Sequence, residues 1–191
     1  MVAAGVRRCN SGRMASTRDK LEKALAAQRL VRISRDLMYA DIETCIVIAM
    51  GAKWVLVRSV VDGGYLDGFS ALRIRDITAV KRDKSFAARS LHLLEGWSAL
   101  LPESPIALDS LPALIETVGA EGRMFGLEKE RQRRALWIGT LDEVDTKWLW
   151  LNEVTFRGRW KKKPLGYRLR AITRISFGGR YMSALQLAAV G

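Results

Sequence analysis

The feature of the sequence that most constrains its fold is an internal repeat. Lys53-Trp54-Val55-Leu56-Val57 resembles Lys147-Trp148-Leu149-Trp150-Leu151, which lies 94 positions later. After one inserted residue, the segment 73–80 resembles the segment 168–175 in the same way. The apolar pattern repeats more clearly than the identities do, so chance similarity between two strand-rich segments is the alternative. A true repeat predicts two copies of one small structural unit.

Each copy is expected to begin with a helix and continue as short strands. Ser16 and Asp19 have the spacing of a capping box, which predicts a helix over 17–29. From Leu30 the apolar residues alternate, as in a strand. The strands expected in the second copy are 123–130, 136–144, 148–155, 159–170 and 173–177. Such short, closely spaced strands favour a small closed barrel, because closure removes exposed edges.

The stretch between the copies is expected to be helical. Residues 86–101 are rich in Ala and Leu, Pro102 and Pro105 end that helix, and Ser110 begins a second one that ends at Gly119. The fold class expected is therefore mainly β with short helices, as two tandem small barrels joined by a helical linker. The expected organisation is a disordered basic tail (1–15, with Met14 a candidate natural start), a first barrel with its helix (16–90), the linker (91–122) and a second, basic barrel (123–191).

Charge is concentrated in the second copy. The chain has 32 basic and 20 acidic side chains, a net charge of +12. Residues 123–191 contain 15 of the basic and 6 of the acidic ones, whereas residues 36–122 contain 8 and 12. Such a field attracts polyanions. The longest apolar run, 45–52, is shorter than the roughly 20 residues of a transmembrane helix, and no signal-peptide core is present. We expect a cytoplasmic protein with reduced cysteines and no membrane partner.

Two segments of the second copy resemble the Sm-like barrels, a family that includes bacterial RNA chaperones. The first is the segment 139–151, which has a Gly, then a Val-Asp turn and then an apolar strand. The second is Arg170-Ala171-Ile172-Thr173-Arg174-Ile175. Trp54-Val55-Leu56 in the first copy resembles the triplet of WYL-type modules, which are also Sm-like barrels of the SH3-like kind. The resemblance implies the barrel and a tendency to bind nucleic acid or to assemble. The family's nucleotide-holding loop residues are not found here.

The strongest candidate site is a basic hairpin around one tryptophan. Phosphates are contacted by Lys and Arg, and an aromatic ring can stack on an unpaired base. Arg168 and Arg170, two apart, should share one face of a strand. The alternative is a solvated edge whose lysines discourage strand pairing. The candidate nucleic-acid-binding residues are Arg157, Arg159, Trp160, Lys161, Lys162, Lys163, Arg168, Arg170, Arg174 and Arg180.

Other residues are expected to be structural. Trp54 and Trp148 occupy the same place in both copies and are expected in the core, whereas Trp137, Trp150 and Trp160 include candidate stacking residues. His92 lacks the partners that catalysis needs. Asp142, Glu143 and Asp145 suit a turn better than a metal site. No phosphate-cradling glycine motif occurs. We therefore expect no catalytic residues, no metal and no cofactor.

The sequence thus favours a non-enzymatic protein that binds RNA or single-stranded nucleic acid, in preference to duplex DNA, through the basic face of the second barrel. The alternative is an adaptor or regulatory module whose barrels contact protein. A third interpretation is a WYL-like ligand sensor, although no DNA-binding helix-turn-helix accompanies it. Homo-oligomers could form through the barrel edges.

Overall fold

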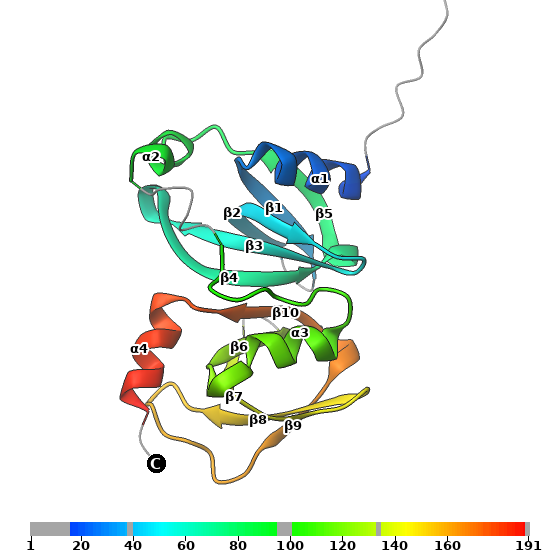
Figure 1. The fold of residues 1–191 in the computed structure, drawn as a ribbon, viewed down its shortest axis with the longest axis vertical. Helices are drawn as coiled ribbons and strands as arrows, with labels where there is room; N and C mark the ends of the chain where they lie inside the picture. Colours follow the sequence, from blue (N-terminus) through cyan, green and yellow to red (C-terminus); the bar gives the residue numbers. More distant parts are fainter. Residues whose placement is uncertain (1–15, 38–39, 95–100, 133–134, 190–191) are drawn as a thin grey trace, which may run out of the picture.

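The computed structural model describes residues 16–37, 40–94, 101–132 and 135–189. Its elements form two successive sets, seen as the upper and lower halves of Figure 1. The first copy comprises α1 (Thr17–Ala27), β1 (Leu30–Asp36), β2 (Ala40–Met50), β3 (Trp54–Val61), β4 (Tyr65–Arg73), β5 (Ile77–Arg82) and α2 (Ala87–Leu94). The second copy comprises α3 (Leu111–Val118), β6 (Phe125–Lys129), β7 (Trp137–Val144), β8 (Trp148–Val154), β9 (Leu165–Arg168), β10 (Ile172–Phe177) and α4 (Arg180–Ala188).

The two copies have the same strand register. Val47 pairs with Val57, and a bulge follows before Ala49. The equivalent pair, Leu141 with Leu151, is followed by a bulge at the equivalent place. The same β-bulge at the same position of both copies is a structural sign of duplication, because bulges are specific features of a fold.

The repeat also extends to the opening helices. Ser16 caps α1 by accepting a hydrogen bond from the N–H of Asp19 at 3.1 Å. Ser110, 94 residues later, caps α3 in the same way through the N–H of Ala113 at 3.3 Å. Each cap satisfies a backbone donor that the helix leaves unpaired. The two caps, each expected separately, are therefore equivalent positions of the repeat.

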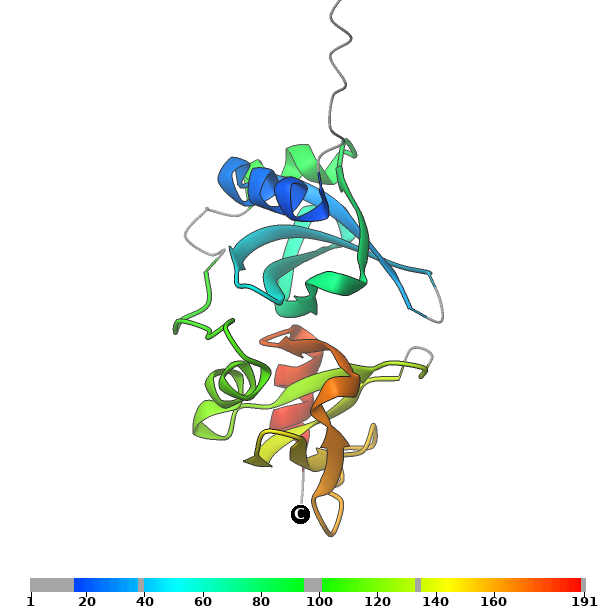
Figure 2. The same ribbon diagram turned by 90° about the vertical axis from the view of Figure 1, so that its right-hand side faces the viewer.

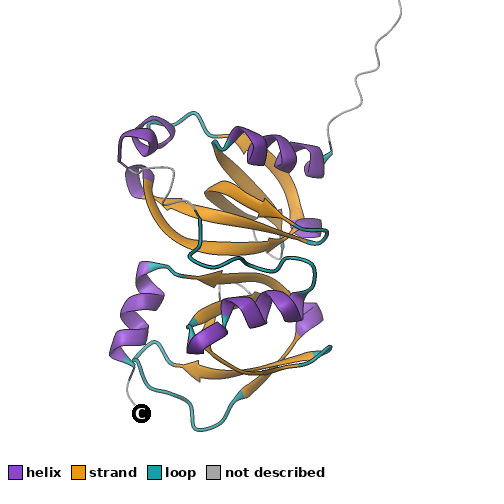
Figure 3. Ribbon diagram, viewed as in Figure 1, coloured by secondary structure: helices purple, strands orange, loops and turns teal. Residues whose placement is uncertain are grey.

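Each opening helix covers the apolar face of its own copy (Figure 3). Leu21 and Ala24 of α1 are buried among the side chains of β1, β2 and β3. Ile115 and Val118 of α3 are the equivalent residues and lie in a cluster with β6 and β8. Because the apolar side chains of a curved sheet need a cover, the helix is part of each structural unit.

The strands form one continuous antiparallel sheet in the order β5-β1-β2-β3-β4-β10-β6-β7-β8-β9. In the described residues no strand pairing joins β4 to β5 or β9 to β10, so the sheet is not closed, and the closure expected from the strand spacing is not observed. Instead β4 of the first copy pairs with β10 of the second, and Phe69 lies opposite Phe177. Figure 2 shows the two halves of this sheet stacked along the molecule. The pairing satisfies the backbone of two strands that would otherwise be edges.

Ion pairs reinforce this junction, and the arginine side chain of each is at most 18% exposed. The Arg35 side chain, 1% exposed, contacts Glu128 of the second copy at 2.9 Å. Arg73 contacts Glu130 at 2.6 Å, and Arg174 of the second copy contacts Glu43 of the first at 3.0 Å. Removing one partner of such a pair would leave a charge in a poorly solvated site. The two copies are therefore held together by charge as well as by backbone hydrogen bonds.

The connection between the copies has a helix at each end, α2 and α3, where helices were expected. α2 begins at Ala87 as expected and ends at Leu94, and the rest of the expected helix up to residue 100 lies outside the described residues. Residues 101–110, the part of the expected linker that is called the linker from here on, form neither helix nor strand and cross the boundary between the copies in Figure 1. The expected tail, residues 1–15, also lies outside the described residues. None of the described helices is long and apolar enough to cross a membrane.

Candidate nucleic-acid interface

Two tryptophans and an arginine form an aromatic platform on the outer face of β8 and β9. Trp148 and Trp150 are half-buried, with ring centroids 6.1 Å apart. Arg168 pairs with Trp148 across the two strands, and its guanidinium carbon lies 5.0 Å from the Trp148 ring centroid. Gly166 lies opposite Trp150 and has no side chain to cover either ring. The platform therefore keeps ring surface accessible beside a positive charge.

A cavity of about 380 Å³ opens beside this platform. It is lined by Thr146, Lys147, Trp148, Arg168, Leu169 and Arg170. The side chains of Lys147, Arg168 and Arg170 are exposed and Leu169 is buried. However, β9 ends at Arg168 and Leu169–Ala171 form a 3₁₀ turn, so Arg168 and Arg170 do not share one strand as expected. Three cations around one aromatic ring suit an anionic ligand with a flat group.

One acidic residue near this cavity, Asp145, shapes the turn between β7 and β8, whereas Asp142 and Glu143, also expected in a turn, lie in β7. The Oδ1 atom of Asp145 accepts hydrogen bonds from the backbone N–H of Lys147 at 2.5 Å and of Trp148 at 2.6 Å. These bonds lower the pKa of Asp145 below its usual range. Asp145 therefore has the turn role expected of it. No group of metal-ligating side chains occurs among the described residues.

The basic segment expected to be a hairpin is the loop between β8 and β9. β9 begins only at Leu165, so the strand expected from residue 159 is much shorter. Arg157, Arg159, Lys162 and Lys163 are all exposed on this loop. The loop therefore carries four exposed cations between the end of β8 and the start of β9.

Lys161 differs from its neighbours because it forms an ion pair. Its Nζ atom lies 2.5 Å from the carboxylate of Glu153, which is 7% exposed. The same carboxylate accepts a hydrogen bond from the Tyr167 hydroxyl at 2.5 Å. Burial and this carboxylate raise the pKa of Tyr167 well above its usual range, so its hydroxyl keeps its proton. Lys161 thus serves to hold the loop against β8.

The loop tryptophan is also held by packing. Trp160 is half-buried against an apolar cluster that includes Met124, Val154 and Leu185. Its backbone also forms an isolated antiparallel β-bridge with Val154. The exposed aromatic ring of this loop is Phe156, which is 81% exposed with the Arg157 guanidinium carbon 5.4 Å from its centroid. Sequence reasoning missed Phe156, although its position next to Arg157 was a usable signal.

Two of the ten candidate residues lie away from the others. Arg174 is in the junction, where it pairs with Glu43 and Glu128, so its charge is already balanced. Arg180 is exposed at the start of α4, and its backbone N–H donates to Asp67 at 3.0 Å. The structure therefore places the loop cations before the start of β9, Arg168 at the end of β9 and Arg170 two residues beyond it, whereas Arg174 and Arg180 lie in the junction and on α4.

Sequence reasoning placed Trp148 in the core and left Lys147 out of the site. Trp54 is indeed buried, at 3% exposure, but Trp148 is only half-buried. Trp150 was among the candidate stacking residues and lies on the platform. The missed signal was the spacing of Trp148 and Trp150, because residues two apart in a strand share one face.

The sequence matches no protein-family model, and the comparisons with curated proteins and with solved structures give no match.

Proposed function

We propose that the chain binds RNA or another single-stranded nucleic acid on the platform of Trp148, Trp150 and Arg168. We expect this binding to be tighter than binding to duplex DNA. The observation that carries this proposal is that Arg168 lies over the ring of Trp148, and that Trp148 and Trp150 are both partly exposed side by side. Unpaired bases stack on such rings, whereas the bases of a duplex are already stacked. Lys147, Arg170 and the loop cations would contact phosphates. In this proposal the protein is non-enzymatic and acts in the cytoplasm.

We further propose that each copy is a small barrel-like unit of the Sm-like kind. Support comes from the shared strand register and from the repeated opening helix. The proposal also rests on the sequence resemblance around residues 139–151 and 170–175. Single-stranded nucleic acids bind on small β-barrels of other kinds through grooves lined by aromatic and basic residues.

The direct test is fluorescence anisotropy with a labelled single-stranded RNA, a single-stranded DNA of the same sequence and a duplex DNA. We expect the full chain to bind both single strands more tightly than the duplex, with affinity that falls steeply with salt. Trp150→Ala should weaken binding, whereas Lys81→Ala, an exposed charge on β5, should not. Equal affinity for the duplex, or binding that ignores Trp150, would overturn the proposal.

A second candidate function, docking of a protein segment, is favoured by one specific observation. In the first copy, Trp54 lies in the same apolar cluster as Leu108 of the linker. The linker backbone at Leu108 is also packed against Gly51, so a Cβ at Gly51 would lie 2.4 Å from its carbonyl oxygen. The equivalent surface of the second copy, at Trp148, has no such cover among the described residues. An extended apolar segment of a partner would fit there, and its binding would depend little on salt.

Assembly of several molecules of this protein through the edges of their sheets stays a prediction. The sheet ends at β5 and β9, which could pair between molecules as β4 and β10 pair within one. However, Lys81 and Arg82 are exposed on β5, and Pro164 directly precedes β9. Edge lysines and prolines oppose strand pairing, so these edges are poorly suited to assembly without a bridging polyanion.

A further inference from the structure

The two most exposed large apolar side chains lie at the same end of the molecule. Among the described residues, Leu187 is 90% exposed and Phe156 is 81% exposed, more than any other large apolar side chain. Leu187 is in the last turn of α4, and Phe156 is near the start of the loop between β8 and β9. The loop packs against the end of α4, since a Cβ at Gly158 would lie 3.2 Å from the carbonyl oxygen of Ala188. Residues 155–164 and 187–189 therefore form one surface, called here the tip.

The tip is supported from within and lies at one end of the long axis of the molecule. Figures 1 and 2 both show the loop between β8 and β9 and the end of α4 at the lower end, with the first copy at the opposite end. Trp160, half-buried against α4, and the ion pair of Lys161 with Glu153 hold the base of the loop. A flat surface could therefore meet the tip and leave the first copy in solvent.

The charge of the tip has one sign. After Glu153 the sequence contains nine basic side chains and no Asp or Glu. The Arg157 guanidinium carbon lies 5.4 Å from the centroid of the Phe156 ring, so a cation is next to the exposed apolar group. The exposed cations of the loop are Arg157, Arg159, Lys162 and Lys163. An anionic surface would be attracted to these cations, and no carboxylate side chain of the loop or of α4 would oppose it.

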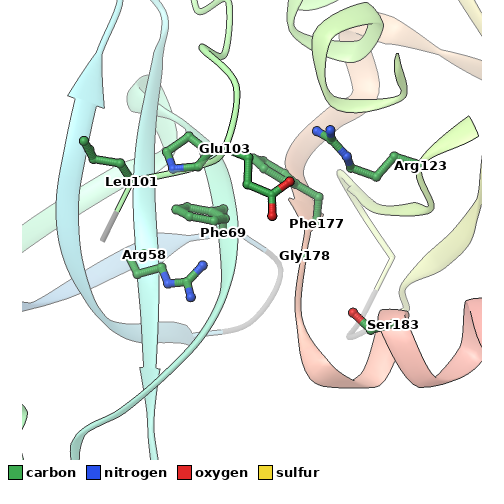
Figure 4. Close-up of a pocket in the computed structure, with 9 residues that line it drawn as sticks. Arg58, Phe69, Leu101, Glu103, Arg123, Phe177, Gly178 and Ser183 are labelled. Atoms are coloured by element: carbon green, nitrogen blue, oxygen red, sulfur yellow. The ribbon is translucent and has the colours of Figure 1, made fainter. Parts of the chain in front are cut away.

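Other exposed apolar side chains lack this setting. Ile42 is 63% exposed, but its neighbours in β2 are Asp41 and Glu43. Leu101 is 65% exposed and lines a cavity of about 420 Å³ between the copies, and Figure 4 shows that Glu103 lines the same cavity. A carboxylate next to an apolar side chain is repelled by an anionic surface. The tip combines high apolar exposure with cations alone, which is the pattern of surfaces that lie on anionic membranes.

We propose that the tip docks on the surface of an anionic lipid bilayer. Phe156 and Leu187 would enter the boundary between headgroups and acyl chains, and the loop cations would contact the anionic headgroups. Bases stack on aromatic rings, so the exposed aliphatic side chain of Leu187 favours lipid over nucleic acid as the occupant. The expectation of no membrane partner rested on the lack of a spanning segment, and a surface contact needs none. The tip does not include the platform of Trp148 and Trp150.

The test is co-sedimentation of the full chain with vesicles of phosphatidylcholine alone and of phosphatidylcholine with phosphatidylserine in about a 7:3 ratio. We expect the chain to bind only the vesicles that contain phosphatidylserine, and this binding to fall as salt is added. Phe156→Ser and Leu187→Ser should each weaken binding about tenfold, because each variant loses an apolar contact with the lipid. Phe86→Ser is the matched control, since Phe86 is 63% exposed in the first copy, and it should bind as the unchanged chain does.

Three results would overturn the proposal: no binding to the mixed vesicles, equal binding to phosphatidylcholine alone, or unchanged binding in both serine variants. The third result would mean that the tip attracts any polyanion, nucleic acid included, through charge alone. Thermal unfolding checks that each variant is folded, which is expected because both side chains are exposed. Trp150→Ala should leave vesicle binding unchanged, and Leu187→Ser should leave RNA binding unchanged. Failure of the tip and failure of the platform are therefore separate results.

Discussion

Trp54 and Trp148 begin equivalent strands of the two copies, but only Trp54 is buried. Each pairs with an arginine of the next strand, Trp54 with Arg73 and Trp148 with Arg168. In the first copy Arg73 reaches the second copy, where it contacts Glu130. In the second copy Arg168 lies over its tryptophan and is exposed. One repeated pair thus serves the junction in one copy and provides a candidate binding surface in the other.

This difference predicts different effects of the same substitution. Trp54→Ala should lower the free energy of unfolding by about 3–5 kcal/mol, because it empties a buried site. Trp148→Ala should change stability much less and should cost about 1–3 kcal/mol of affinity for single-stranded RNA. Urea unfolding and anisotropy measure the two effects. Equal losses of stability in both variants would show that Trp148 has a core role.

The lysines of the loop between β8 and β9 should separate into two kinds. Replacing Lys162 and Lys163 with Ala should reduce the slope of log affinity against log salt by about 1.4, since each single-strand phosphate contact contributes about 0.7. Lys161→Ala should instead lower stability by about 1 kcal/mol, because Glu153 loses its ion-pair partner. A salt slope unchanged in the double variant, with the fold intact, would remove the loop from the site.

Arg174 is expected to matter for folding and not for binding. Arg174→Ala should destabilise the chain by about 3 kcal/mol, because the Glu43 carboxylate, 8% exposed, would lose its ion pair and keep, among the described residues, only the hydrogen bond from Ser59. Adding Glu43→Gln should recover part of that loss. Chemical denaturation of both variants measures the difference. If Arg174→Ala instead weakened RNA binding and left stability unchanged, Arg174 would belong to the nucleic-acid site.

The junction should weaken in acid through Glu130. The hydrogen bond from Arg73 is the largest influence on this carboxyl group and holds the pKa of Glu130 below its usual range. Ionised Glu130 therefore stabilises the fold at neutral pH, and this contribution is lost as the pH falls below about 4. Glu130→Gln should show a shallower loss of stability between about pH 5 and pH 3. Identical acid profiles for the two proteins would contradict this role.

Much of the local structure follows from short-range pattern. The spacing of Ser16 and Asp19 and the position of Ser110 predict the helix starts, the alternation from Leu30 predicts β1, and the expected strand 148–155 differs from β8 by one residue. These features depend on neighbouring residues, because caps and strand faces are set by side chains a few positions apart. The repeat added the expectation that both copies share one order of strands, which the sheet confirms.

The sequence by itself therefore determined a mainly β chain of two equivalent units, each with an opening helix, and a basic second unit. The tertiary structure alone decided that β4 pairs with β10 and that the sheet stays open. It also decided which of two equivalent tryptophans is covered, and that Lys161 and Arg174 are paired while Lys162 and Arg168 are exposed. The reason is physical: a residue's type and spacing set its local conformation, but its burial and charge partners come from segments more distant in the chain.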